Sequence, residues 1–196
     1  MDTVILKYPA GNVFSVKSAF SRLGAECVIS DDVDVLRCAD RVVVPGQGEA
    51  SVTMHYLRQT GLDNVIRSLS QPVLGICIGM QLMCDSSEEG NAQCLGIFEG
   101  ACVKRFAPQH GEKIPHMGWN SLRDLDGPLF RGIAEGSYAY FVHSYYVPLN
   151  AFTAAKSDYC GEFTAAMSRG NFHAVQFHPE KSGLAGEAIL ENFLRL

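Results

Sequence analysis

Short apolar runs recur through the first 80 residues of the chain. They are rich in Val, Ile and Leu and lie at residues 3–6, 27–29, 41–44 and 72–76. Short, mostly apolar runs of this kind are typical of strands that are buried on both faces. These four segments are therefore predicted strands.

The segments between these runs carry helical spacing. After the breaker Pro9-Ala10-Gly11, a helix is predicted to begin at Asn12 and to end at Gly24. Its apolar face consists of Val13, Val16, Phe20 and Leu23. Further helices are predicted at residues 49–59 and 62–69. Strands that alternate with helices indicate right-handed crossovers and a mostly parallel sheet.

Beyond residue 90 the segments become shorter, with frequent Gly, Pro and aromatic residues. Strands are predicted at residues 96–106, 138–147 and 172–177, and these make the sheet mixed. A last helix is predicted at residues 184–194, where Ala185, Ile189 and Phe193 follow one another at four-residue steps. We therefore expect one α/β domain over residues 1–196, with a mixed, mostly parallel open sheet flanked by helices.

Composition excludes several classes of function. The 196 residues are 47% hydrophobic and 19% charged, which is ordinary for a globular chain. A net charge of −5, with no block of Lys and Arg, argues against a nucleic-acid partner and against an anionic membrane surface. No basic leader and no apolar run of membrane-spanning length is found, so we expect a cytoplasmic protein.

The cysteines and histidines show no metal-binding or disulfide pattern. The seven cysteines form an odd set without a Cys-x-x-Cys pair, and the six histidines lack ligand spacing. We expect neither a metal nor another cofactor. Six cysteines are predicted to be packing residues: Cys27, Cys38, Cys84, Cys94, Cys102 and Cys160.

The seventh cysteine lies in a different setting. Cys77 ends the apolar run 72–76 and is flanked by Gly75 and Gly79, after which helix-forming residues follow. This is the pattern of a nucleophile elbow, in which glycines remove colliding side chains and the helix N-terminus favours the thiolate. The alternative is that Cys77 is a small buried apolar residue. The elbow pattern favours a nucleophile that attacks a carbonyl group.

A second motif could supply the base. His178 and Glu180 are two residues apart, so on an extended strand their side chains leave the same face, while Pro179 stiffens the backbone. Glu180 would orient the imidazole, and His178 would take and return the proton of Cys77. Both motifs follow predicted strands, where α/β sheets place their ligand crevices. The alternative is a surface loop.

Attack on an amide also requires donors for the oxyanion. The backbone N–H of Ile78, directly after the nucleophile, is one candidate. The other is the backbone N–H of Gln47 in the segment Pro45-Gly46-Gln47-Gly48, whose glycines permit a close approach and a positive φ. The alternative reading of this segment is a plain turn.

Together these motifs resemble the class I, triad-type glutamine amidotransferases. The resemblance lies in GICIGMQ at residues 75–81 and in HPE at residues 178–180. PHMGWN at residues 115–120 and FVHSYY at residues 141–146 are similar to one branch of that family, the glutaminase subunits of imidazole glycerol phosphate synthases. The likeness spans essentially the whole chain and implies a flavodoxin-like fold.

The resemblance implies an activity and a partner. Glutamine would be attacked at its side-chain carboxamide, and the resulting glutamyl thioester would be hydrolysed to glutamate. Ammonia would pass to a (β/α)₈-barrel subunit in a heterodimer. That subunit would use the ammonia to make imidazole glycerol phosphate and an aminoimidazole carboxamide ribotide in histidine biosynthesis.

The resemblance also implies roles for individual residues. The catalytic residues would be Cys77, His178 and Glu180. Six residues would hold the glutamine, with Gln81 the one that acts through its side chain: Gly46, Gly48, Gln81, His143, Ser144 and Tyr145. Pro115, Met117 and Trp119 would face the synthase partner, and the alternative for Trp119 is a place in the core.

Two segments depart from the family pattern. The family usually has Val at the position of Gln47, and Asp-Tyr-Gly where this chain has Lys7-Tyr8-Pro9. We expect the backbone donor at Gln47 to tolerate the change. We also expect partner binding to reorganise residues 46–48, which would make the isolated chain a poor glutaminase.

Other functions remain compatible with the motifs. A triad amidotransferase could serve another acceptor, in pyridoxal phosphate or purine synthesis, and its partner would distinguish it. A cysteine hydrolase with a similar elbow would leave His178-Pro179-Glu180 unexplained. An inactive regulatory subunit would not need Cys77, His178 and Glu180 together.

Overall fold

A seven-stranded sheet forms the centre of the computed structural model, which describes residues 2–9, 12–108 and 111–196. Its strands are, in spatial order, β11 (Thr153–Asp158), β12 (Glu162–Arg169), β13 (Phe172–Val175), β4 (Val73–Ile76), β3 (Arg41–Val44), β1 (Thr3–Leu6) and β2 (Cys27–Ser30). Neighbours from β13 to β2 are parallel, whereas β11, β12 and β13 pair antiparallel. The predicted mixed, mostly parallel sheet is confirmed.

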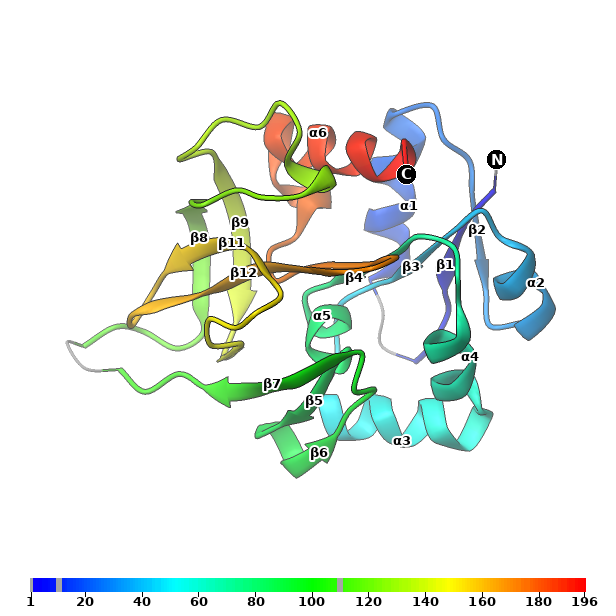
Figure 1. The fold of residues 1–196 in the computed structure, drawn as a ribbon, viewed down its shortest axis with the longest axis horizontal. Helices are drawn as coiled ribbons and strands as arrows, with labels where there is room; N and C mark the ends of the chain where they lie inside the picture. The colour runs from blue at the N-terminus through cyan, green and yellow to red at the C-terminus, as the bar shows by residue number, and fades with distance from the viewer. Residues whose placement is uncertain (1, 10–11, 109–110) are drawn as a thin grey trace.

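Helices cover both faces of this sheet (Figure 1). On one face lie α1 (Val13–Arg22) and α6 (Gly183–Leu194), and on the other lie α2 (Val33–Cys38), α3 (Ala50–Thr60), α4 (Leu62–Ser68) and α5 (Ile78–Leu82). Val42 and Val44 of β3 belong to the core beneath α2–α5, and Val43 belongs to the core beneath α1 and α6. The strands are continuously apolar because both of their faces are buried.

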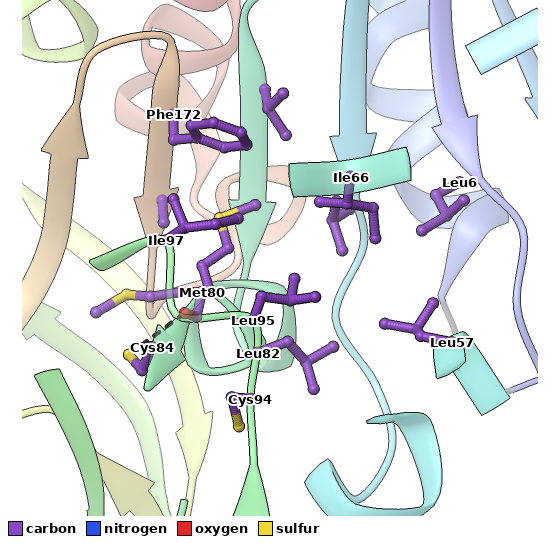
Figure 2. Packing of buried hydrophobic residues seen from close by; sticks show 14 of the residues in the cluster. Leu6, Leu57, Ile66, Met80, Leu82, Cys84, Cys94, Leu95, Ile97 and Phe172 are labelled. Atoms are coloured by element: carbon purple, nitrogen blue, oxygen red, sulfur yellow. Dashed lines mark hydrogen bonds between the residues drawn. The ribbon is translucent and has the colours of Figure 1, made fainter. Parts of the chain in front are cut away.

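The core beneath α2–α5 is closely packed. Figure 2 shows Leu57 of α3, Ile66 of α4 and Leu82 of α5 among its buried side chains, together with Phe172 of β13. Cys84 lies in the same cluster, where its thiol donates a hydrogen bond to the Met80 carbonyl at 3.7 Å. This packing fixes α5, the helix that follows Cys77, against the sheet.

Two smaller sheets flank the central one. The first contains β10 (Tyr145–Tyr146), β7 (Phe98–Arg105), β5 (Cys84–Ser87) and β6 (Ala92–Gln93), and the second contains β8 (His116–Ser121) and β9 (Tyr138–His143). The strands predicted at residues 96–106 and 138–147 therefore do not join the central sheet. Strands β7 and β9 pack on opposite faces of it, since Phe98 belongs to one core and Phe141 to the other. The end of the second predicted segment forms β10, which pairs with β7.

Most predicted elements of the first 80 residues are present within one or two residues of their expected ends. Helix α2 was not predicted; the Asp32 carboxylate caps it by accepting from the Asp34 and Val35 amides. Asn12 precedes α1 as expected, but its side chain makes no capping hydrogen bond. The predicted breaker includes residues 10 and 11, which lie outside the described residues.

The second half was predicted less completely. Strands β11 and β12 were not predicted individually, because Ala, Ser and Thr dominate them and weaken the apolar pattern. Three short 3₁₀ turns also occur: η1 (Glu89–Asn91), η2 (Pro128–Phe130) and η3 (Pro179–Lys181). The prediction that six cysteines serve packing is wrong for Cys38 and Cys102, which are exposed on the surface. No helix in the described ranges is long and apolar enough to cross a membrane.

Candidate active site

Three neighbouring parallel strands, β13, β4 and β3, end at the same edge of the sheet. Cys77 follows β4, residues 45–48 follow β3, and His178 follows β13. A cavity of about 320 Å³ lies at this edge. Its lining includes Gly46, Gln47, Gly48, Cys77, Ile78, Gln81, Glu89, Pro115, Val142, His143, Ser144, Tyr145 and His178. The expected crevice at the carboxyl ends of the strands is thus present.

The backbone at Cys77 makes a sharp turn between β4 and α5. Its φ of 52° and ψ of −107° are rarely adopted by a residue with a side chain. Close backbone contacts maintain this turn. A Cβ added at Gly79 would lie 2.2 Å from the Val44 carbonyl oxygen, and one at Gly46 would lie 2.0 Å from the Ile76 carbonyl oxygen. The glycines are therefore required for the close approach, as the sequence predicted.

His178 connects the sulfur to a carboxylate. Its Nδ1 donates to Glu180 Oε1 at 2.8 Å, and both side chains are only 1% exposed. The Cys77 side chain also interacts with this imidazole and contributes to its pKa. Burial alone would lower the pKa of His178, but the hydrogen bonds to Cys77 and Glu180 and the charges of both raise it to about 10. The raised pKa favours the protonated imidazole beside Glu180.

The local geometry at His178 differs from the predicted one. Residues Pro179–Lys181 form the 3₁₀ turn η3 and not an extended strand. The prediction that His178 and Glu180 share one face of an extended strand is therefore wrong, although their side chains do form a hydrogen bond. A proline at the first position of the turn favours this geometry, because its φ is already helical.

Ser182 and Tyr140 hold the histidine backbone, and the sequence analysis identified neither. The His178 amide donates to the Tyr140 carbonyl at 2.8 Å. The Tyr140 amide donates to Ser182 Oγ at 2.9 Å, and that hydroxyl donates to the His178 carbonyl at 2.6 Å. Strand β9 and residue 182 thereby brace both backbone polar groups of the histidine.

The two expected oxyanion donors lie at the cavity. Ile78 is the first residue of α5, where backbone N–H groups have no partner within the helix. On the opposite side, Gly48 has a φ of 133°, a value that favours glycine, and the Gln47 side chain is exposed. The Tyr8 hydroxyl donates to the Pro45 carbonyl at the start of this loop. Burial and the charge of Cys77 raise the pKa of Tyr8. Tyr8 was not among the predicted site residues.

The six predicted glutamine-binding residues all line the cavity. The side chain of Gln81, however, is engaged within the protein. Its Nε2 donates to the Tyr145 carbonyl at 3.0 Å and to Gln176 Oε1 at 2.9 Å. The first role that the geometry gives to Gln81 is to fix the cavity wall at residues 142–145.

Glu89 lines the cavity as well and was not predicted. Its Oε2 accepts a hydrogen bond from the Ala50 amide at 2.8 Å, and burial raises its pKa. The η1 turn brings it to the site from outside the three strands, so no local pattern in the sequence marks it. Among the described residues, no group of three His, Cys, Asp or Glu side chains could hold a metal ion.

The residues expected to face a partner occupy one side of β8. Met117 is 66% exposed and Trp119 is 55% exposed. His116, which lies between Pro115 and Met117 in the chain, is buried. The alternative that Trp119 lies in the core is therefore wrong. Trp119 packs edge-to-face on Tyr140 at 6.0 Å. Pro115 is exposed and also lines the cavity, so this face continues to the site.

Comparisons with known proteins agree with this geometry. The class-I glutamine amidotransferase family matches residues 11–196. The imidazole glycerol phosphate synthase subunit HisH of Bacteroides fragilis is 56% identical over 197 residues, and HisH of Escherichia coli is 46% identical over 198 residues; each alignment covers 100% of both chains.

Solved structures share the fold. A glutamine amidotransferase structure superposes with a TM-score of 0.75 at 22% identity, covering 98% of this chain and 97% of the other. A glutamine amidotransferase from Thermotoga maritima gives a TM-score of 0.65 at 17% identity, covering 100% of this chain and 83% of the other. The family match and the sequence relatives establish that the chain belongs to the class-I glutamine amidotransferases and, within them, to the HisH subunits of imidazole glycerol phosphate synthase.

Proposed function

We propose that this chain hydrolyses glutamine to glutamate and ammonia as the glutaminase subunit of an imidazole glycerol phosphate synthase. The observation that carries the proposal is that Cys77 and His178 line one cavity, with the Glu180 carboxylate hydrogen-bonded to the imidazole of His178. Residues that are about 100 positions apart in the chain meet there. Such a set has the parts that an acyl transfer through a thiol requires.

The reaction proceeds in two halves. The Cys77 thiolate attacks the side-chain carboxamide carbon of glutamine, and the imidazolium of His178 gives its proton to the departing ammonia. This leaves a glutamyl thioester on Cys77. Water then attacks the thioester while His178 accepts its proton, and glutamate leaves as the thiolate is restored. Glu180 keeps the ring oriented and stabilises its positive charge throughout.

The cavity also provides groups for the other parts of the substrate. The backbone N–H groups of Ile78 and Gln47 stabilise the oxyanion of each tetrahedral intermediate. The Glu89 carboxylate is the anionic side chain in the lining, and it would pair with the α-amino group of glutamine. The backbone of residues 143–145 and of Gly48 would hold the α-carboxylate end.

A (β/α)₈-barrel synthase subunit would receive the ammonia and use it to make imidazole glycerol phosphate. Pro115 lines the cavity, and Met117 and Trp119 follow it as exposed residues of β8, so the three suit such a docking face. Leu184, at the start of α6, is 86% exposed, and its neighbour Gly183 lies beside the Trp119 ring. An apolar surface of this kind, beside the site, would let ammonia pass without release to solvent.

Glutamine hydrolysis by the chain with a barrel synthase subunit tests the proposal. Cys77→Ala should reduce ammonia release by about 10⁴-fold or more, since the thioester cannot form. Cys102→Ala, which removes an exposed thiol outside the cavity, should leave the rate unchanged. We expect a one-to-one complex and a much lower rate for the chain alone, because the partner would reorganise residues 46–48. Ammonia release that persists in Cys77→Ala would refute the assignment.

A further inference from the structure

Two buried histidines outside the catalytic set face each other across β8 and β9. His116 and His143 are paired in the strand register, and their rings approach at 2.9 Å between His116 Nδ1 and His143 Nε2. Aromatic rings enclose them. The His116 ring is stacked between Tyr159 at 4.1 Å and Phe141 at 5.0 Å, measured between ring centroids. The reaction described above uses neither imidazole.

The hydrogen bonds determine where the protons lie. His143 Nδ1 lies 2.7 Å from the Tyr145 carbonyl oxygen, which can only accept, so Nδ1 of His143 carries a proton. In a neutral ring, Nε2 of His143 is then an acceptor. It accepts from Nδ1 of His116, and Nε2 of His116 is in turn left as an acceptor.

The hydrogen bonds of Asn120, which lies on the far side of His116 from His143, give the same proton positions independently. Asn120 Nδ2 donates to the Asp158 carbonyl at 2.8 Å, and Asn120 Oδ1 accepts from the Ser121 amide at 2.8 Å, so the orientation of the amide is fixed. Asn120 Nδ2 lies 3.3 Å from His116 Nε2 and is a donor there. Both ends therefore assign the neutral Nδ1–H form to both rings. Burial agrees, because it lowers the pKa of His116 to about 4 and that of His143 to about 3.

The same hydrogen bonds continue to the nucleophile. The Tyr145 carbonyl that accepts from His143 also accepts from Gln81 Nε2 at 3.0 Å. Gln81 Nε2 donates further to Gln176 Oε1 at 2.9 Å. That contact turns the amide nitrogen of Gln176 toward Cys77, where Nε2 lies 3.7 Å from the sulfur. The series of hydrogen bonds therefore ends on an N–H that donates to the Cys77 sulfur.

We propose that His116 is a positioning residue for the nucleophile: through His143 it holds the Tyr145 carbonyl, which fixes the Gln81–Gln176 pair that donates to the Cys77 sulfur. The proposal rests on the proposed function, because that function makes Cys77 the nucleophile. It assigns a role in the reaction to an imidazole on the strand that carries Met117 and Trp119 on its opposite side.

Three variants of one residue separate this role from core packing. His116→Asn keeps an N–H donor near the position of Nδ1, whereas His116→Gln moves the donor to the position of Nε2, and His116→Phe fills the aromatic site without any donor. Unfolding and circular dichroism identify the variants that fold. We expect the Gln and Phe variants to lose about tenfold in kcat, and the Asn variant to stay within about threefold of the native protein.

A second readout does not depend on turnover. The rate of carbamidomethylation of Cys77 by iodoacetamide, followed at that residue by mass spectrometry, should fall about tenfold in the Gln and Phe variants and be rescued in the Asn variant. If the native chain does not hydrolyse glutamine, the proposed function fails, while this rate still judges the role of His116. A folded Phe variant whose turnover and carbamidomethylation rate equal those of the native protein would overturn the proposal.

The native protein provides the remaining test, which stands if the variants do not fold. The ¹⁵N chemical shifts of the ring nitrogens report which nitrogen carries the proton. The signals are assigned by selective labelling, or by their loss in His116→Asn. We expect both rings to be neutral and protonated on Nδ1 from pH 6 to pH 8. A proton on Nε2 of either ring, or a charged ring at pH 7, would overturn the proposal.

Discussion

Cys77 and His178 emerge from two adjacent parallel strands, yet the protein holds their backbones in different ways. The two strands, β4 and β13, are in register, and the Cys77 amide donates to the Val175 carbonyl at 2.8 Å. From that common starting point, the nucleophile is fixed by backbone packing. The histidine is fixed by hydrogen bonds to a strand that comes from elsewhere in the chain.

The nucleophile arm, defined as residues 75–79, depends on the absence of side chains at its glycines. Gly75 and Gly79 lie so close together that a Cβ on Gly75 would be 2.9 Å from the Gly79 backbone. Gly79 in turn lies against the Val44 carbonyl. These contacts hold the positive φ of Cys77, which would otherwise relax toward an ordinary conformation.

The histidine arm, defined as residues 178–182, depends on added partners. Tyr140 and Ser182 satisfy the backbone N–H and C=O of His178, and Glu180 satisfies the Nδ1 side of the ring. Each of these groups could be removed without steric conflict. Substitutions in the nucleophile arm should therefore lower stability first, whereas substitutions in the histidine arm should lower activity first.

The largest effect is expected at Gly79. Gly79→Ala places a methyl group against the Val44 carbonyl, where the backbone cannot yield, so it should lower the free energy of unfolding by about 3 kcal/mol. Gly100→Ala is the matched control. Gly100 has a φ of 80° and open space around it, so the cost there is conformational strain of about 1 kcal/mol. Urea unfolding of both variants measures the difference, and equal losses would remove the steric argument.

A smaller effect, on rate and not on folding, is expected at Ser182. Ser182→Ala removes the hydroxyl that joins Tyr140 to the His178 carbonyl, and kcat for glutamine hydrolysis should fall about tenfold. Ser137→Ala is its counterpart, because the Ser137 hydroxyl donates a similar bond to the Ala134 carbonyl outside the cavity. If the two variants have the same kcat, the brace at Ser182 does not serve catalysis.

The smallest effect is expected at Tyr8, which supports the loop opposite the elbow. Tyr8→Phe removes the hydrogen bond to the Pro45 carbonyl while keeping the buried ring, and should reduce kcat about threefold by loosening residues 46–48. Tyr56→Phe on α3 is a suitable control. Steady-state rates at saturating glutamine compare the two, and an unchanged rate in Tyr8→Phe would exclude this support from the mechanism.

The nucleophile arm could be predicted from the sequence because its determinants are local. Gly75, Cys77 and Gly79 are adjacent in the chain, and the apolar run before them predicts the strand. The loop at residues 45–48 was found for the same reason. The expected pairing of His178 with Glu180 is present, but the assumed extended strand is a 3₁₀ turn, since Pro179 favours the start of a helical turn.

The residues that were missed reach the site across long distances in the sequence. Glu89 comes from η1, Tyr8 from the end of β1, and Ser182 acts through Tyr140, 42 residues away. Their side chains are common types with no distinctive neighbours. Gln81 was assigned to the substrate from its motif, whereas its amide nitrogen is used to hold Tyr145 and Gln176.

The sequence by itself determined most of the strands and helices of the first 80 residues, the elbow at Cys77 and the short motifs that mark the family, because each of these depends on residues close together in the chain. Only the tertiary structure decided which distant groups orient His178, that Trp119 is exposed, and that His116 and His143 share a chain of hydrogen bonds leading to the sulfur. Strand pairing and burial create those contacts, and both depend on how the whole chain packs.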